Sequence, residues 1–242
     1  RIDLKKTSGF PIEYDNENLV VKDFSFEKKI DICIDKVRDQ LLNKELTCPD
    51  IFYTKYKGLD NNDIYKSKGF RVNFYTLKPN LAGIEYVKTR ATRCRSYARI
   101  IDIIYGGATI LIQNYVNPKN NRIIKVSAKK EQKIIIPPGY ELVVVNTRQN
   151  TTLIFAEYLS TKARSKVVLD DNNGLAYYII RKNAKQETVR NPNYKIVNEA
   201  EKVDWDRILK EYNITPKTPV IKQLMRKYEK FDWLFKENSV SI

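Results

Sequence analysis

The 242-residue chain contains no histidine, the side chain that proteins use most often for acid–base catalysis near neutral pH and for binding transition metals. A Ser-His-Asp triad and any metal site built on imidazole are therefore excluded. The three cysteines, Cys33, Cys48 and Cys94, are odd in number and form no CxxC pair. We expect free thiols in a reducing compartment, and neither a zinc site nor a disulfide framework.

Long apolar segments are also missing from the sequence. No apolar run approaches the roughly 20 residues that a membrane-spanning helix needs, and the first residues, Arg1–Lys6, lack the apolar core of a signal peptide. We therefore predict a cytoplasmic protein without a membrane span. No Walker loop, GxGxxG or RNP-like pattern occurs, so we predict no cofactor.

Basic residues are in excess, because 44 Lys and Arg against 29 Asp and Glu give a net charge of +15. This excess favours an anionic partner such as nucleic acid, anionic lipid or a phosphorylated small molecule. The alternative is a composition rich in Lys, Asn, Ile and Tyr, which AT-rich coding produces without any partner. The segment Lys88–Arg99 contains five cations and no acid. Arg93 and Arg95 with Tyr97 make a nucleic-acid partner possible, although no motif supports it and a solvated basic loop is the simpler interpretation.

From Gly69 onward the sequence predicts many short strands. Phe70–Leu77 alternates between the two faces and is rich in β-formers. Further expected strands are Ile84–Lys88, Arg99–Tyr105, Thr109–Tyr115, Ile123–Ser127, Lys133–Ile136, Leu142–Asn146, Thr152–Leu159, Lys166–Leu169, Ala176–Arg181 and Glu187–Val189. Turn signals separate them at Lys78–Asn80, Gly106–Gly107, Asn117–Asn121, Pro137–Gly139 and Asn146–Asn150. Short strands spaced by turns indicate an all-β sandwich or barrel.

Helical patterns flank the predicted barrel. The spacing of apolar residues predicts a helix over Phe26–Leu46, ended by Pro49, after which Ile51–Tyr56 is a further candidate strand and Gly58–Lys68 a loop. Two more helical patterns cover Ala200–Tyr212 and Val220–Phe235. We therefore divide the chain into an N-terminal extension (residues 1–68), a barrel (69–195) and a helical C-terminal tail (196–242) that packs on the barrel or on a partner subunit.

Several segments carry a resemblance to one family. They are Ile136-Pro-Pro-Gly-Tyr140, Val145-Asn146, Leu153-Ile-Phe-Ala-Glu-Tyr158, Gly174-Leu-Ala-Tyr-Tyr-Ile-Ile180 and Arg190-Asn-Pro-Asn-Tyr194. Their order resembles the cupin-type glucose-6-phosphate isomerases of archaea and some bacteria. The resemblance implies an all-β cupin-like jelly-roll barrel, here with N-terminal and C-terminal helical extensions, and a homodimer or higher homo-oligomer.

The diagnostic motif of that family is absent. In the family, three His and one Glu hold a divalent metal, and aligning the segments places Arg90, Thr92 and Leu142 at the three His and Arg99 at the Glu. Arginine is a permanent cation that only donates hydrogen bonds, and leucine has no lone pair. The resemblance therefore implies a barrel of this family that binds no metal and lacks the family's proton-transferring base.

The same replacements suggest an anion site. Two arginines suit a phosphate or carboxylate, and the resemblance adds three further contacts for a sugar phosphate or another anion. The candidate anion-binding residues are Lys88, Arg90, Arg99, Tyr158 and Lys166. The alternative is that Arg90 and Arg99 pair with Glu85, Asp102 or Glu157 and fill the barrel.

Three functions follow from these observations. The first is a catalytically inactive relative of the isomerase, a pseudoenzyme retained for binding or assembly. The second is a structural subunit built on a jelly roll, for example in a virion or a scaffold. The third is an active isomerase with a rebuilt site, in which Glu85 or Glu141 would serve as the base.

Overall fold

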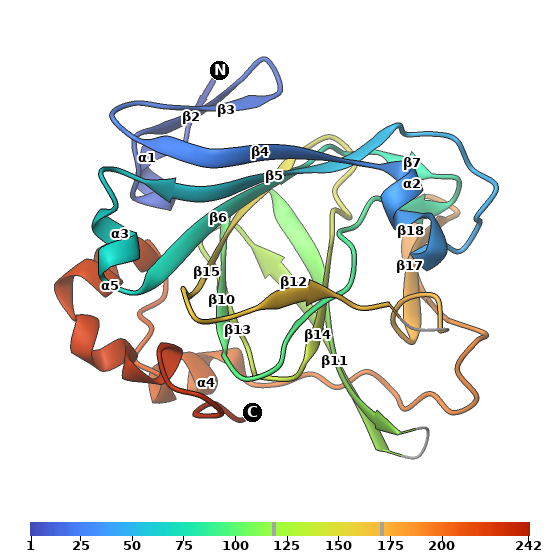
Figure 1. The fold of residues 1–242 in the computed structure, drawn as a ribbon. Helices are drawn as coiled ribbons and strands as arrows, with labels where there is room; N and C mark the ends of the chain where they lie inside the picture. Colours follow the sequence, from blue (N-terminus) through green and yellow to red (C-terminus); the bar gives the residue numbers. More distant parts are fainter. Residues whose placement is uncertain (118–119, 170–171) are drawn as a thin grey trace.

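The computed structural model describes residues 1–117, 120–169 and 172–242, and two antiparallel sheets form its centre (Figure 1). The six-stranded sheet has the order β13 (Lys133–Ile136), β10 (Arg99–Tyr105), β15 (Leu153–Ser160), β6 (Phe70–Leu77), β5 (Ile51–Asp60) and β4 (Ser25–Cys33). The five-stranded sheet has the order β12 (Asn120–Lys129), β11 (Gly107–Asn117), β14 (Glu141–Val145), β9 (Thr92–Cys94) and β16 (Ser165–Val167). The predicted all-β jelly-roll barrel is confirmed.

Apolar side chains from both sheets meet inside this barrel. Because successive side chains of a strand point to opposite faces, every second residue of β10, β14 and β15 faces inward. The interior cluster includes Ile101 and Ile103 from β10, Leu142 and Val144 from β14, and Phe155 from β15. This burial of branched apolar residues holds the two sheets together.

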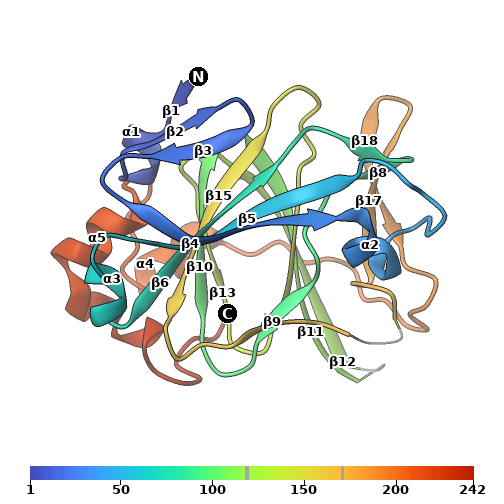
Figure 2. The same cartoon turned by 45° about the horizontal axis from the view of Figure 1, so that its top comes forward.

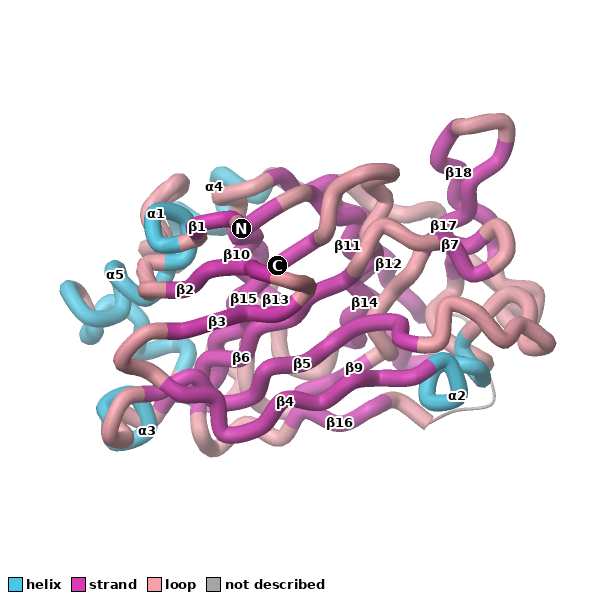
Figure 3. Tube along the Cα trace, turned by 90° about the horizontal axis from the view of Figure 1, so that it is seen from above, coloured by secondary structure: helices cyan, strands magenta, loops and turns pink. Residues whose placement is uncertain are grey.

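Two smaller sheets and the helices lie at the ends of the barrel. β1 (Ile2–Asp3), β2 (Ile12–Asp15) and β3 (Asn18–Val21) form a three-stranded sheet, and β18 (Lys185–Arg190), β17 (Tyr177–Lys182), β8 (Glu85–Tyr86) and β7 (Leu81–Ala82) form a four-stranded one. In Figure 3 the β17–β18 hairpin projects at one end, whereas α1 (Lys5–Ser8), α3 (Ile64–Ser67) and α5 (Val220–Arg226) gather at the other. No helix in the described part of the chain is long and apolar enough to cross a membrane.

The C-terminal tail packs on the outer face of the six-stranded sheet. It comprises α4 (Trp205–Glu211), α5 and the 3-10 segment η2 (Tyr228–Leu234), which lie beside α3 in Figure 2. Apolar residues of the tail share one cluster with the outward-facing Ile100 and Tyr158. The buried carboxylate of Asp102 also accepts a hydrogen bond of 3.1 Å from the backbone N–H of Val220, which ties the start of α5 to β10.

The helix predicted over Phe26–Leu46 is wrong. The segment begins as β4, which extends to Cys33 and pairs along its length with β5, and only the short α2 (Ile34–Val37) and the 3-10 turn η1 (Arg38–Gln40) follow it. Phe26, Ile30 and Ile32 lie an even number of residues apart, so one face of a strand presents all three, and β-branched Ile favours that conformation. The period of two therefore outweighs the partial helical spacing.

Other boundaries differ less. The loop predicted over Gly58–Lys68 is wrong at both ends, because β5 continues to Asp60 and α3 forms before β6. The two C-terminal helical patterns are confirmed with shorter bounds. The turn predicted over Asn117–Asn121 contains residues 118–119, which lie outside the described residues.

Candidate functional site

The resemblance in the sequence aligns four residues with metal-binding positions, and three of them, Thr92, Arg99 and Leu142, are neighbours in the barrel interior. Arg99 reaches from β10 across the barrel to β9, where its Nη1 donates to Thr92 Oγ1 at 2.8 Å and its Nη2 to the Thr92 carbonyl at 3.2 Å. Leu142 is the register partner of Thr92 and belongs to the interior apolar cluster. Arg90, two residues before Thr92, has its Nε 3.4 Å from the hydroxyl of Tyr53, another interior residue.

Glu157 compensates the charge of Arg99. Its carboxylate lies 3.4 Å from Arg99 Nη1, and the two side chains are 4% and 1% exposed. Asn73 is directly opposite Glu157 in the β6–β15 register and donates to it at 3.0 Å, and the hydroxyl of Tyr75 donates at 3.1 Å. Burial alone raises the pKa of Glu157, but the cations Arg99 and Lys55 and these two hydrogen bonds outweigh it, so the pKa is lowered and the carboxylate is ionised at neutral pH.

The residues of this region do not fit a divalent metal. Arg90 and Arg99 offer donors only, Leu142 offers no ligand atom, and the one nearby carboxylate, Glu157, already accepts from three side chains. A dication at this place would also face the permanent charge of Arg99. Among the residues that the structure describes, no group of three or more His, Cys, Asp or Glu is placed to hold a metal ion.

Lys88 and Tyr158 lie away from this region. Lys88 is buried in an ion pair of 2.7 Å with Glu85 and donates to the Gln40 carbonyl, and its Nζ lies 4.7 Å from the centre of the Tyr178 ring. Tyr158 follows the inward-facing Glu157 directly, so it points to the opposite face of the sheet, under the C-terminal tail. The structure thus joins Arg99 to Thr92 and Glu157 and Arg90 to Tyr53, and it places Lys88 and Tyr158 elsewhere.

Lys166 lies on the outside of the barrel in a concave surface that we call the outer basic groove. Lys166 on β16 is the register partner of Arg93 on β9, next to the loop that follows β9. The groove has a volume of ≈ 650 Å³, and Tyr97 is part of its lining. Its charged lining consists of Arg93, Arg95, Lys162, Arg164 and Lys166 with the acids Glu141 and Glu237. Arg93 lies 3.9 Å from Glu141, so part of the positive charge is compensated and most of it is not.

Asn73 and Tyr75 are the site residues that the sequence analysis does not single out. Both stand on the inward face of Phe70–Leu77, and Glu157 is a lone carboxylate within the apolar strand Leu153–Ser160. A charged residue in a fully buried strand needs donors beside it. Glu157 in an apolar strand therefore indicates from the sequence that hydrogen-bond donors lie beside it. Which residues donate can be named only once the β6–β15 register is known.

Comparisons with known proteins identify one family and several similar structures. The family description "Glucose-6-phosphate isomerase (GPI)" matches residues 45–197. No curated protein matches. Among solved structures, a cupin 2 domain-containing protein from Halorhodospira halophila is 12% identical, with 49% of this chain and 71% of that chain covered and a TM-score of 0.36. A cupin 2 conserved barrel domain protein from Rhodopseudomonas palustris is 13% identical, with 49% and 68% covered and a TM-score of 0.35.

An oxalate oxidase structure is 11% identical, with 48% of this chain and 55% of that chain covered and a TM-score of 0.39. The match therefore spans about half the length of the oxalate oxidase chain.

Proposed function

The chain belongs to the cupin-type glucose-6-phosphate isomerase family, and we propose that it is a catalytically inactive member retained for binding or assembly. The observation that supports the proposal is the buried Arg99–Glu157 ion pair, because the resemblance aligns Arg99 with a metal-binding Glu. A proton-transfer catalyst needs a titratable group near the operating pH beside the substrate. An arginine guanidinium is not a proton-transfer group, and Glu157 is held ionised by its cations and hydrogen bonds.

A rebuilt isomerase site on Glu85 or Glu141 has less support. Glu85 is 1% exposed, and its carboxylate accepts from Lys88 and from the backbone N–H of Leu42. Glu141 precedes the inward-facing Leu142, so its side chain leaves the barrel on the outer face, where Gln113 donates to it at 3.1 Å. Neither carboxylate faces the Arg99 region.

Interconversion of fructose 6-phosphate and glucose 6-phosphate tests the proposal. We expect no turnover above the blank by the purified chain, with or without added Mn(II). Turnover that disappears in Glu85→Gln or Glu141→Gln, with Asp206→Asn on the tail as the matched control, would overturn the proposal and establish a rebuilt site.

Anion binding has support at the outer basic groove. Five cations from β9, β16 and the neighbouring loops face two acids there, and this excess attracts a sugar phosphate or another anion. We expect fructose 6-phosphate to bind in calorimetry, with saturation that is lost in Arg93→Ala/Lys166→Ala and kept in the control Lys182→Ala on the β17–β18 hairpin. Loss of binding in Arg90→Ala instead would place the anion inside the barrel, and the absence of any binding would leave assembly as the function.

Assembly is the second candidate, because the family resemblance implies a homodimer and a jelly roll also serves as a structural subunit. Light scattering on the purified chain distinguishes a homodimer from a larger assembly. A dimer at all concentrations agrees with the inactive-enzyme proposal, whereas larger closed or filamentous particles favour a structural subunit.

A further inference from the structure

A pocket in the C-terminal tail is lined by most of the basic residues of the tail, although basic and acidic residues are nearly equal in number there. Residues 196–242 contain nine Lys and Arg and eight Asp and Glu. Five of the nine cations line this one pocket, which has a volume of ≈ 520 Å³, but only one of the eight acids, Asp206, does so. The five are Lys210, Lys222, Arg226, Lys227 and Lys230. Composition alone does not produce this separation of charge.

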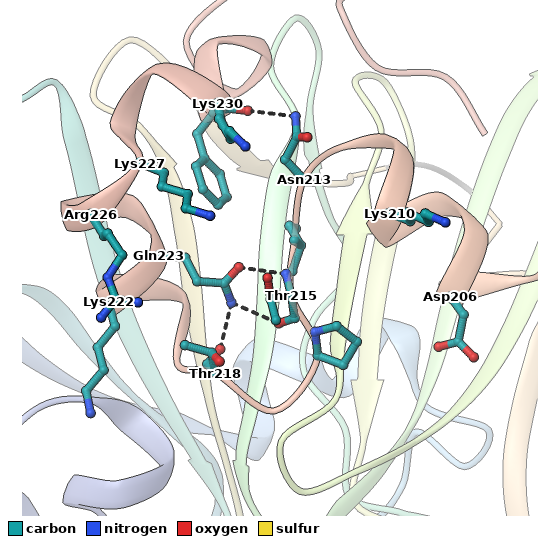
Figure 4. A pocket seen from close by; sticks show the side chains of 13 residues that line it. Asp206, Lys210, Asn213, Thr215, Thr218, Lys222, Gln223, Arg226, Lys227 and Lys230 are labelled. Atoms are coloured by element: carbon teal, nitrogen blue, oxygen red, sulfur yellow. Dashed lines mark hydrogen bonds between the residues drawn. The ribbon is translucent and has the colours of Figure 1, made fainter.

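The walls of the pocket are held in place by hydrogen bonds (Figure 4). Gln223 of α5, which is 8% exposed, accepts from the backbone N–H of Thr215 at 2.7 Å and donates to the carbonyls of Thr215 and Thr218 at 2.9 and 2.8 Å. Asn213 donates to the carbonyl of Lys230 at 3.3 Å. The loop between α4 and α5 is thereby fixed to α5 and η2, so the pocket is formed before any ligand enters.

The five cations around the pocket are not neutralised by ion pairs. In the described part of the chain no ion pair involves any of them, while the tail's own ion pairs, Arg207–Glu211 and Lys236–Asp232, use residues outside the lining. Figure 4 shows Lys210 on one side of the pocket and Lys222, Arg226 and Lys227 on the other. Like charges arranged around a concavity raise the local concentration of anions.

The base of the pocket is apolar. Ile214 and Phe231, which are 2% and 1% exposed, belong to the lining and to the apolar cluster beneath the tail. The volume falls within the range of about 300–1,000 Å³ that is typical of small-molecule sites. Cations on opposite walls suit more than one phosphate, and an apolar base suits a ring or another apolar group.

We propose that this pocket binds an organic molecule carrying two or more phosphate groups. The pocket lies outside residues 45–197, which the family match covers, so this inference goes beyond the proposed function and does not depend on it. Lys227 and Lys230 would contact phosphate from the α5–η2 side, Lys210 from the α4 side, and Phe231 would lie under the apolar group.

Calorimetric titration of the full chain with ADP, inorganic pyrophosphate and AMP tests this inference. We expect ADP to bind in this pocket more tightly than pyrophosphate, which lacks the ring, and than AMP, which lacks the second phosphate. Lys227→Gln/Lys230→Gln should weaken ADP binding about tenfold or more, because charge-assisted contacts are lost, and Lys210→Gln on the opposite wall should weaken it independently.

The matched control is Lys236→Gln, which removes the same charge from the same end of the tail but outside the pocket. It should leave the affinity for ADP unchanged. The inference is overturned if ADP does not bind, if pyrophosphate binds as tightly as ADP, or if Lys236→Gln weakens binding as much as the pocket variants.

Discussion

Arg99 and Glu157 are both almost fully buried, so each charge depends on the other for compensation. Removing water from two ions costs several kcal/mol per ion, and a close partner with additional hydrogen bonds recovers that cost. Thr92 binds the guanidinium, and Asn73 and Tyr75 bind the carboxylate. These contacts make the pair a fixed part of the barrel interior.

A double-mutant cycle tests this pairing. We expect Glu157→Gln to lower the free energy of unfolding by about 3–5 kcal/mol, because Arg99 remains buried without a counter-ion. Arg99→Met should cost a similar amount. The double variant should cost clearly less than the sum, since the introduced amide still accepts from Asn73 and Tyr75 and no charge is left alone. Additive losses in urea unfolding would contradict the pairing.

Asp102 should give the fold a pH dependence of the opposite sign to that of Glu157. Burial raises the pKa of Asp102 from 3.8 to about 6, although Lys133 and the Val220 N–H oppose the shift. Because the folded chain then binds the proton more tightly than the unfolded chain, this contribution to stability is full below pH 3.8 and is lost as the pH rises through 6.

Asp102→Asn isolates this effect. The unfolding free energy of the native chain minus that of the variant should increase as the pH falls from about 7 to about 4, approaching about 3 kcal/mol for a shift of roughly two pKa units. Urea unfolding at several pH values measures it. A difference that stays constant would show that the pKa of Asp102 is not shifted by folding, and one that shrinks toward low pH would show that folding lowers it; either result contradicts the prediction.

The turn between β10 and β11 depends on its glycine. Gly106 has φ of 80°, and a Cβ there would lie 2.7 Å from the carbonyl oxygen of Thr152. Gly139, with φ of 83°, has no atom closer than 3.9 Å to such a Cβ. At both positions the positive φ makes any residue with a Cβ less stable than glycine. Only at Gly106 would the Cβ also clash with a neighbouring atom.

Alanine substitution at the two glycines separates these costs. Gly139→Ala should lower stability by roughly 1 kcal/mol, the cost of a positive φ for alanine, and Gly106→Ala by clearly more. Thermal unfolding of the two variants gives the comparison. Equal losses would mean that the β10–β11 turn shifts freely away from Thr152.

Strands with a strong pattern of their own can be predicted from the sequence. Phe70–Leu77, Arg99–Tyr105 and Lys133–Ile136 are expected with the bounds that β6, β10 and β13 have. The helix expected over Phe26–Leu46 is wrong because the apolar residues there partly fit both periods, and pairing with β5 decides the outcome. The local sequence pattern of this segment does not reveal that it pairs with β5.

The candidate site, too, can be predicted from the sequence only in part. The resemblance aligns Arg90, Thr92, Arg99 and Leu142 with one site. In the structure Thr92 contacts Arg99 and lies opposite Leu142, whereas Arg90 contacts Tyr53. Tyr158 cannot share the face of its neighbour Glu157, as strand alternation already implies. The partners of Glu157 on β6 depend on the β6–β15 register, which no spacing in the sequence reveals.

At the scale of the whole molecule, positive charge is distributed unevenly, because buried cations are paired and surface cations are gathered at two places. The net charge of +15 includes the outer basic groove and the C-terminal pocket, and the buried cations Lys88, Arg99 and Lys133 each have a carboxylate partner. The places suited to anions therefore lie on the outside.

We propose that the Arg99–Glu157 pair stands in place of a metal in the barrel, and Mn(II) titration of the full chain, followed by electron paramagnetic resonance of the free ion, tests this most directly. With and without fructose 6-phosphate, we predict that all added Mn(II) stays free. One tightly bound Mn(II) per chain that is lost in Glu157→Gln would contradict the account, because Glu157 would then be a metal ligand and no longer the counter-ion of Arg99.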